Sequence, residues 1–455
     1  MTRSATSAAS RQLLGEAAQR YADWIAGEYS SSSTDALTRA VREHALVDPS
    51  GGPLKLVLRP RFILEADYEA LVTVAATLSR ALFAAVHVVR RDERLRRRLA
   101  YPEYLEDVLA LDDGRAGWPT IGRFDALIDA SQRPHFIEYN SEPKGMNEYF
   151  ELGDAFERLS IAAAFRERFP FRSLSLFNLT TEALTRWCAK AQGNGASTVG
   201  VVSTGPALAQ DPSFRHMAYA AARGRDIVVA RAEEYEWNGT RLYLAEQPID
   251  HLVFVDWTEI FARRAEAEGL FSAIQAGAVH VLNGVSLGVL CSYKHTLELL
   301  TDEQYELPLD PDLRAVVRAH VPWTRALRPT KTTLDGRSID LLAYVDQHKD
   351  EFVLKPGGGS GGVGVSIGGR CTSSEWAQAL AQAIGTHVVQ RYEKPQAEVY
   401  PVLEGDAVAF RQLEADCCPF VWNGERGEAC SVRASGTGVF NRGRGAMPLA
   451  LWILQ

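Results

Sequence analysis

A glycine-rich stretch at residues 351–365, EFVLKPGGGSGGVGV, constrains this chain more than any other segment. An apolar run over residues 352–354 leads into Lys355 and a proline, and five of the next six residues are glycine. Val363 and Val365 then alternate with small residues, as a second strand would, so the pattern predicts strand, glycine loop, strand. Such a loop can turn several backbone N–H groups toward one anion, and a lysine at its base adds positive charge. The predicted ligand is a polyphosphate.

Three alternative interpretations of the loop have to be weighed. A P-loop places its lysine after the glycines and before a helix, whereas Lys355 precedes the glycines here. A G-x-G-x-x-G fingerprint can be traced through Gly357, Gly359 and Gly362, but that motif opens a helix, and alternating valines follow it here. A flexible hairpin tip without a ligand is the remaining alternative, and the rest of the chain has to decide.

Length and charge limit the class of protein. The chain has 455 residues, of which 46% are hydrophobic and 23% charged, as expected for a soluble globular protein of two or three domains. Its 49 basic and 57 acidic residues give a net charge of -8, which disfavours nucleic acid and anionic membranes as partners. The six cysteines have no C-x-x-C spacing, so we expect reduced thiols. The N-terminus lacks a long apolar segment, and a cytoplasmic protein is expected.

Residues 121–142, IGRFDALIDASQRPHFIEYNSE, predict two antiparallel strands around a polar turn. Asp125 then lies on one strand and Glu138 on its neighbour, and Glu138 and Asn140 project from the same face because they are two residues apart. Two carboxylates and an amide oxygen form an all-oxygen set that suits Mg²⁺ beside phosphates. An exposed hairpin with ordinary surface acids explains the same residues, so the metal site is a hypothesis at this point.

The segments around this hairpin differ in character. Apolar residues fall at helical spacing over residues 13–24 and again over 71–86. The second segment leads into the basic run RRDERLRRR, which is typical of a solvated helix end and receives no site. Residues 198–282 alternate buried-strand and helical patterns, including a helix over residues 214–222, and predict a small doubly wound α/β domain. N-G turns at Asn238 and Asn423 predict hairpins.

Two further segments carry positive charge. SYKHTLELL, residues 292–300, predicts a helix with Lys294 in its first turn, where a lysine opposes the helix dipole unless an anion shares the site. After the glycine loop, a helix over residues 374–384 and a buried strand, HVVQRYEKP, are predicted, followed by more antiparallel strands. The last segment, SVRASGTGVFNRGRGAMP, is again rich in glycine and arginine.

These motifs, in this order, resemble the ATP-grasp superfamily, and specifically its circularly permuted branch, which includes glutathionylspermidine synthase and eukaryotic glutathione synthetase. In ordinary ATP-grasp enzymes the metal-binding E-x-N comes late, whereas GRFDALID and FIEYNSEP precede the glycine loop here, as in the permuted branch. The resemblance covers roughly residues 116–455. It implies an α/β fold: an antiparallel-sheet ATP-grasp core with a glycine-rich lid, an inserted doubly wound domain and a helical N-terminal region. The implied boundaries are 1–115 for the helical region, 116–195 for the first part of the core, 196–290 for the inserted domain and 291–455 for the lid and remaining core.

The resemblance also implies roles for individual residues. Asp125, Glu138 and Asn140 match Mg²⁺ ligands, Arg123 matches a phosphate contact, and Arg433 matches a late arginine near the transferred phosphate. Lys294 and Lys355 match the two lysines that bind ATP, and Arg123, Lys355 and Arg433 are the expected catalytic residues. The loop expected to hold the phosphates comprises Gly357, Gly358, Gly359, Ser360, Gly361 and Gly362. The strand whose backbone is expected to contact adenine comprises Gln390, Arg391 and Tyr392.

The implied activity is ATP-dependent ligation. A carboxylate would be activated as an acyl phosphate and captured by an amine, giving an amide with ADP and phosphate. The expected cofactors are ATP and Mg²⁺, the expected partners are a small-molecule carboxylate and amine, and a homodimer stays open. An ATP-dependent phosphotransferase and a nucleotide-binding protein without turnover are the alternatives.

One departure from the family pattern concerns the loop itself. Glutathione and glutathionylspermidine synthetases carry an acidic residue within it, whereas GGGSGGVGV carries none. The difference leaves no acidic metal ligand in the loop and argues against either of those two enzymes as the identity of this chain.

Overall fold

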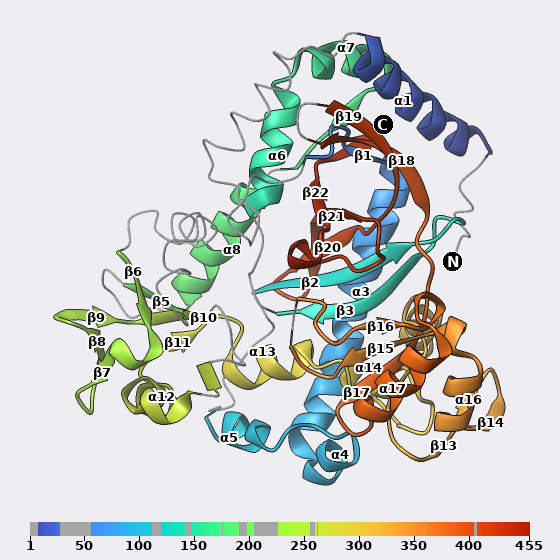
Figure 1. Cartoon of the computed structure of the whole chain (residues 1–455). Coiled ribbons are helices and arrows are strands. Elements are labelled where there is room, and N and C mark those ends of the chain that lie inside the picture. The colour runs from blue at the N-terminus through green and yellow to red at the C-terminus, as the bar shows by residue number, and fades with distance from the viewer. Residues whose placement is uncertain are drawn as a thin grey trace.

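The computed structural model describes residues 8–27, 56–111, 120–141, 147–174, 176–190, 198–203, 226–254, 260–261, 263–359, 361–404 and 407–455. Figure 1 shows a long helix running through the molecule, an antiparallel sheet beside it and two smaller lobes toward its lower end. The fold is therefore a mixture of helices and largely antiparallel sheets, in agreement with the predicted α/β class.

The largest sheet has seven strands in the order β18-β19-β21-β20-β2-β3, with β22 paired to β21. Its strands are β2 (Ile121–Ile128), β3 (Pro134–Asn140), β18 (Ala397–Glu404), β19 (Ala407–Ala415), β20 (Cys418–Trp422), β21 (Arg426–Ser435) and β22 (Met447–Leu449). The predicted N-G turn joins β20 and β21, with φ values of 52° at Asn423 and 71° at Gly424, as a type I′ turn requires. Because β2 pairs with β20, the predicted hairpin lies against the last part of the chain.

Helix α3 (Glu65–Arg91) packs on β20 and β21. Its apolar side chains, among them Leu71 and Leu78, are buried, as their helical spacing predicted. Gly427 on β21 lies so close to the carbonyl of Val72 that a Cβ would overlap with it. In the described part of the chain α3 is the one helix long and apolar enough to cross a membrane, but here the same side chains fill the core.

The two ends of the described chain pack together. β1 (Arg61–Leu64) pairs in parallel with β23 (Leu451–Leu454), which also pairs with β4 (Phe171–Arg172). Tyr21, Phe62, Phe165 and Trp452 form an aromatic cluster beneath these strands. The helices on this side are α1 (Ala8–Gly27), α6 (Asn147–Glu157) and α7 (Ser160–Arg168). The helical region predicted for residues 1–115 thus also contributes a strand beside the C-terminal one.

The lobe on the right of Figure 1 carries the glycine loop. Its antiparallel sheet has the order β12-β17-β15-β16, and helix α17 (Ser373–Ala383) covers it at the predicted position. The other elements are β12 (Thr324–Ala326), β13 (Lys331–Leu334), β14 (Arg337–Asp340), α16 (Leu341–Gln347), β15 (Phe352–Pro356), β16 (Ser366–Ile367) and β17 (His387–Arg391). β15 and β16 pair across the loop, which confirms strand, loop, strand, but β16 begins at Ser366 and not at the preceding valines.

The lobe on the left contains the predicted parallel strands, in the order β11-β10-β5-β6. All three neighbouring pairs are parallel. The strands are β5 (Val199–Ser203), β6 (Ile227–Arg231), β10 (His251–Phe254) and β11 (His280–Val281), and the hairpin with the Asn238 turn is β7 (Tyr235–Trp237), β8 (Leu242–Leu244) and β9 (Gln247–Ile249). Nearby helices are α8 (Leu176–Lys190) and α12 (Glu268–Gln275). The helix predicted over residues 214–222 lies outside the described residues.

Short elements connect these parts. The helices are α4 (Glu93–Arg98), α5 (Tyr104–Ala110), α13 (Val285–Ser292), α14 (Thr296–Thr301) and α15 (Pro311–His320). The 3-10 turns are η1 (Ala232–Glu234), η2 (Arg264–Glu266), η3 (Lys349–Glu351), η4 (Gly368–Arg370) and η5 (Arg442–Arg444).

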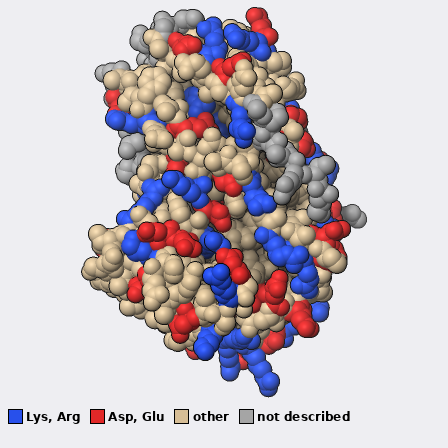
Figure 2. Space-filling model, turned by 90° about the vertical axis from the view of Figure 1, so that its right-hand side faces the viewer, with Lys and Arg blue, Asp and Glu red and all other residues tan. Residues whose placement is uncertain are grey.

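Figure 2 shows basic and acidic side chains interspersed over one face of the molecule.

Candidate functional site

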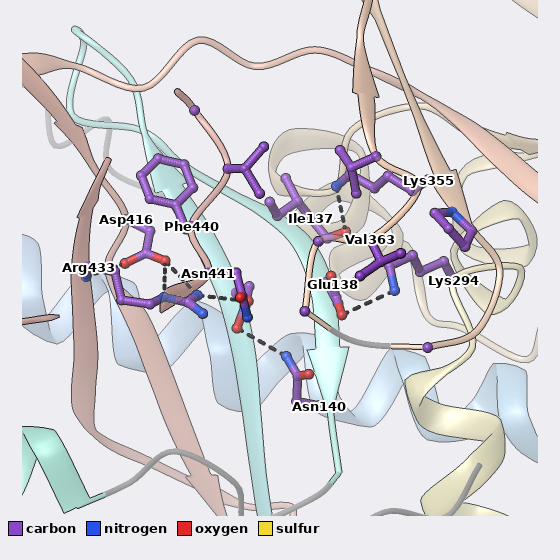
Figure 3. Close-up of a pocket in the computed structure, with 18 of the residues that line it drawn as sticks. Ile137, Glu138, Asn140, Lys294, Lys355, Val363, Asp416, Arg433, Phe440 and Asn441 are labelled. Atoms are coloured by element: carbon purple, nitrogen blue, oxygen red, sulfur yellow. Dashed lines mark hydrogen bonds and ion pairs between the residues drawn. The ribbon is translucent and has the colours of Figure 1, made fainter. Parts of the chain in front are cut away.

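A pocket of about 410 Å³ lies between the β2–β3 hairpin, the glycine loop and residues 438–443. Figure 3 shows the polar side chains of both strands and of the loop base gathered around it. The sequence-predicted residues that line it are Arg123, Asp125, Glu138, Asn140, Lys294, Lys355, Gly358, Gly359, Gly361, Gly362 and Arg433. Gly357, Gln390, Arg391 and Tyr392 are not among its lining residues, and Ser360 lies outside the described residues.

The hairpin delivers four polar residues to one wall of the pocket. Arg123 pairs with Asn140 and Asp125 pairs with Glu138, so all four side chains share one face of β2 and β3. The opposite face carries apolar residues, among them Phe124, that pack into the core. The placement of Asp125, Glu138 and Asn140 therefore follows the predicted strand alternation.

Asp125 is surrounded by donors. Its carboxylate accepts hydrogen bonds from Arg123 Nε at 2.9 Å, Arg433 Nη2 at 2.8 Å and Asn140 Nδ2 at 3.1 Å. Burial opposes its ionisation, but the two guanidinium groups outweigh burial and hold the pKa of Asp125 well below its usual range. Two arginines bind this carboxylate, and its role as a metal ligand stays a prediction.

Two lysines form the opposite wall. Lys294 Nζ lies 3.1 Å from Glu138 Oε1, and Lys355 Nζ donates to Gln390 Oε1 at 2.6 Å. Burial lowers the pKa of Lys355 to about 8, although Glu138 favours its charged form. Lys294 precedes α14, whereas the sequence predicted it within the first helical turn, and its N–H donates to the Gly357 carbonyl at 2.9 Å. That hydrogen bond ties the base of the glycine loop to the backbone of Lys294.

Glycine is favoured in the loop for two different physical reasons. Gly359, Gly361, Gly362 and Gly364 have φ values between 68° and 83°, a region that side chains disfavour. At Gly357 and Gly358 the cause is space, because a Cβ there would overlap the side chains of His295 and Tyr293.

The predicted adenine-contacting strand lies behind the pocket. The N–H of Arg391 donates to the Trp323 carbonyl at 2.9 Å, and that of Tyr392 donates to the Glu351 carbonyl at 2.8 Å. Gln390 is fully buried and holds Lys355. The N–H groups of Arg391 and Tyr392 are therefore already bonded within the protein, and the adenine contact expected at this segment stays a prediction.

Two contributors were not identified from the sequence. Asp416, which follows β19, is buried at the pocket wall and accepts hydrogen bonds from Arg433. Val439, Phe440 and Asn441 come from the second glycine-rich segment, of which only Arg433 had been assigned. The glycine content of that segment was the available signal, whereas Asp416 belongs to no recognisable motif.

Comparisons with known proteins bear on the fold. No protein-family model matches the chain, and no curated protein matches it by sequence. Among solved structures it is similar to the apo form of a glutathione synthetase-like effector from Globodera pallida, with a TM-score of 0.59 over 92% of this chain and 96% of that chain. The two chains share a fold. They are 10% identical, so the likeness shows a shared fold and not a shared activity.

The fit of the pocket to Mg²⁺ can be tested on its donors. Among the described residues no group of three His, Cys, Asp or Glu side chains is arranged to hold a metal ion. Glu138 and Asn140 nevertheless present hard oxygen atoms on one strand face, and Mg²⁺ beside phosphates is commonly held by only one or two carboxylates. The residues present fit a metal shared with a phosphate ligand, with Glu138 as its carboxylate.

Proposed function

We propose that this protein is an ATP-dependent carboxylate–amine ligase that holds the ATP phosphates in the pocket between the β2–β3 hairpin and the glycine loop. The observation that carries the proposal is the charge of the pocket. Five basic side chains line it, from Arg123, Lys294, Lys355, Arg433 and Arg442, against three acidic ones, from Asp125, Glu138 and Asp416. An excess of positive charge beside a glycine loop favours a polyanion.

The order of charge along the loop supports a nucleotide held by ATP-grasp geometry. Lys355 precedes the glycines on β15, the backbone of Lys294 is tied to the loop through Gly357, and both lysines line the pocket. They would bind phosphate oxygens, while loop N–H groups bind others. Closure of the loop would exclude water from the reacting groups.

Mg²⁺, held by Glu138 and Asn140, would neutralise charge that develops on the transferred phosphoryl group. Arg123 and Arg433 lie on the same wall and would orient the transferred phosphate and the substrate carboxylate. Phosphoryl transfer to that carboxylate would give an acyl phosphate and ADP. Attack by an amine would then release phosphate and form the amide, so the chain itself needs to provide no covalent nucleophile.

The test is ADP and phosphate release measured against panels of amino acids, peptides and polyamines, with mass spectrometry of the products. The ligase proposal expects equal amounts of ADP and phosphate, with an amide product, only when acid and amine are both present. ADP with a stable phosphorylated product and no free phosphate would instead identify a phosphotransferase. MgATP binding without turnover on any panel would identify a nucleotide-binding protein.

A further inference from the structure

Asp416 and Arg433 are joined more closely than an ordinary ion pair. Asp416 Oδ2 accepts from Arg433 Nε at 2.7 Å, and its Oδ1 accepts from the Arg433 backbone N–H at 2.6 Å. The Asp416 N–H in turn donates to the Arg433 carbonyl at 3.0 Å. Both the backbone and the side chain of the arginine are therefore fixed by one aspartate.

The other end of the Arg433 side chain reaches the hairpin. Its Nη2 donates to Asp125 Oδ2 at 2.8 Å, and Asp125 also binds Arg123. The guanidinium thus lies between the carboxylates of Asp416 and Asp125 at the wall of the pocket, and Figure 3 shows Arg433 beside Asp416.

Stability alone is a weak reason to keep such a pair. Asp416 is 1% exposed, and a buried ion pair gains little over apolar residues of the same volume because both charges lose their hydration. One arginine also has to serve two carboxylates, those of Asp416 and Asp125. The contacts are instead those of a side chain held in one orientation.

We propose that Asp416 is a positioning residue that fixes the guanidinium of Arg433 in the orientation in which it meets a phosphate group bound in the pocket. This inference rests on the proposed function, since it assumes that the pocket binds a polyphosphate. In this role Asp416 acts through Arg433 and makes no contact with the ligand.

The sign of the change in affinity on replacing Asp416 distinguishes a positioning role from a simple charge effect. Replacing Asp416 by asparagine makes the pocket more positive, so charge alone would tighten the binding of an anion. Loss of orientation predicts weaker binding, because a misplaced guanidinium no longer meets the ligand at hydrogen-bonding distance. The direction of the change therefore distinguishes the two effects.

The experiment measures the Kd of MgATP by calorimetry for wild type, Asp416→Asn, Arg433→Ala and the double variant. We expect Asp416→Asn to weaken binding about 10- to 100-fold and to have no further effect once Arg433 is alanine. The matched control is Asp302→Asn, which removes a buried aspartate whose Oδ2 lies 3.1 Å from Arg325 Nε, outside the pocket, and should leave the Kd unchanged. Arg433→Lys keeps the charge but lacks the planar fork, and should weaken binding as Asp416→Asn does, even if that variant does not fold.

The proposal is overturned if Asp416→Asn or Arg433→Lys binds MgATP as tightly as wild type or more tightly. It is also overturned if the Asp302 control loses as much affinity, or if the losses of the two single variants add in the double variant. Inorganic tripolyphosphate serves as a second probe. If wild type binds tripolyphosphate but not MgATP, the ligase proposal fails and the same series decides the role of Asp416 with that probe. If wild type binds neither, both proposals are overturned.

Discussion

The buried ammonium group of Lys355 has its pKa lowered to about 8, mainly because burial penalises the charged form, with Glu138 opposing the shift. The side chain is therefore charged at neutral pH and loses its proton as the pH rises through about 8. A bound polyphosphate favours the charged form. Protonation of Lys355 therefore raises the affinity for the ligand, and bound ligand in turn favours protonation of Lys355.

We accordingly expect the affinity for MgATP to fall as the pH rises from about 7 to about 9.5. The measurement is the Kd at several pH values in wild type and in Lys355→Ala. The variant should bind more weakly throughout and lack most of this pH dependence. An identical pH dependence in both proteins would remove Lys355 from the phosphate site.

Glu138→Gln removes a charge from the proposed metal site while keeping the size of the side chain. Phosphoryl transfer should slow by about two to three decades, corresponding to roughly 3–4 kcal/mol. The readout is the rate of ADP release per folded protein, with folding checked by circular dichroism.

The control for this change is Glu404→Gln, which loses a surface pair with Arg411 outside the pocket and should leave turnover unchanged. Near wild-type turnover by folded Glu138→Gln would take Glu138 out of the site. In that case the hairpin would be ordinary surface structure.

Local patterns were sufficient to predict part of the pocket. The two-residue alternation of a strand places Glu138 and Asn140 on one face whatever else the chain does. The contact between Asp416 and Arg433 has no such local cause, because it depends on how β19, β20 and β21 are arranged in the sheet. The same tertiary dependence explains why the contact between Asp125 and Arg433 was not predicted from the sequence.

Among the structural elements, the glycine loop allows a test of the two physical reasons for its glycines. Gly357→Ala should destabilise the protein because the new Cβ would overlap the His295 ring. Shortening that ring in His295→Ala makes room, so Gly357→Ala should cost less in that background. Gly359→Ala meets open space but has a φ of 82°, and its cost of about 1–2 kcal/mol should be independent of His295.

Urea unfolding of these single and double variants gives the comparison. A cost for Gly357→Ala that is equal in both backgrounds would contradict the packing between His295 and the loop base. A cost for Gly359→Ala that depends on His295 would contradict the separation of the two causes.

The predicted elements agree with the structure where local geometry decides. Both N-G turns and the strand before the glycine loop follow from residue type alone. The valines after the loop were predicted as strand, yet Val363 is 65% exposed and β16 begins at Ser366, because alternation alone does not reveal where pairing starts. Gln390–Tyr392 lie in or next to a strand, as predicted, but only the tertiary structure shows that the N–H groups of Arg391 and Tyr392 donate to the carbonyls of Trp323 and Glu351.

At the scale of the whole molecule, the pairing of β1 with β23 joins segments from opposite ends of the chain. Local sequence patterns carry no information on such a pairing, which is why no strand was predicted at residues 61–64. Trp452, fully buried on β23, stacks on Phe171 with ring centroids 3.9 Å apart.

Trp452→Ala should therefore destabilise the protein by roughly 3–5 kcal/mol, the usual cost of removing a large buried aromatic side chain. Denaturant unfolding followed by circular dichroism measures this loss. Val399→Ala, at a side chain that is 58% exposed, is the control and should change little. A loss below about 1 kcal/mol for Trp452→Ala would contradict the packing of the two chain ends described above.

The central claim is that the pocket binds the phosphates of ATP, and titration of wild-type protein with MgATP tests it most directly. Calorimetry should give saturable binding, and unfolding at about 100 times the Kd should show roughly 2.7 kcal/mol of added stability. The variant with both Lys294→Ala and Lys355→Ala should remain folded and show neither effect. Absence of binding heat and of a stability change at millimolar MgATP in wild type, or equal binding by the double variant, would contradict the account.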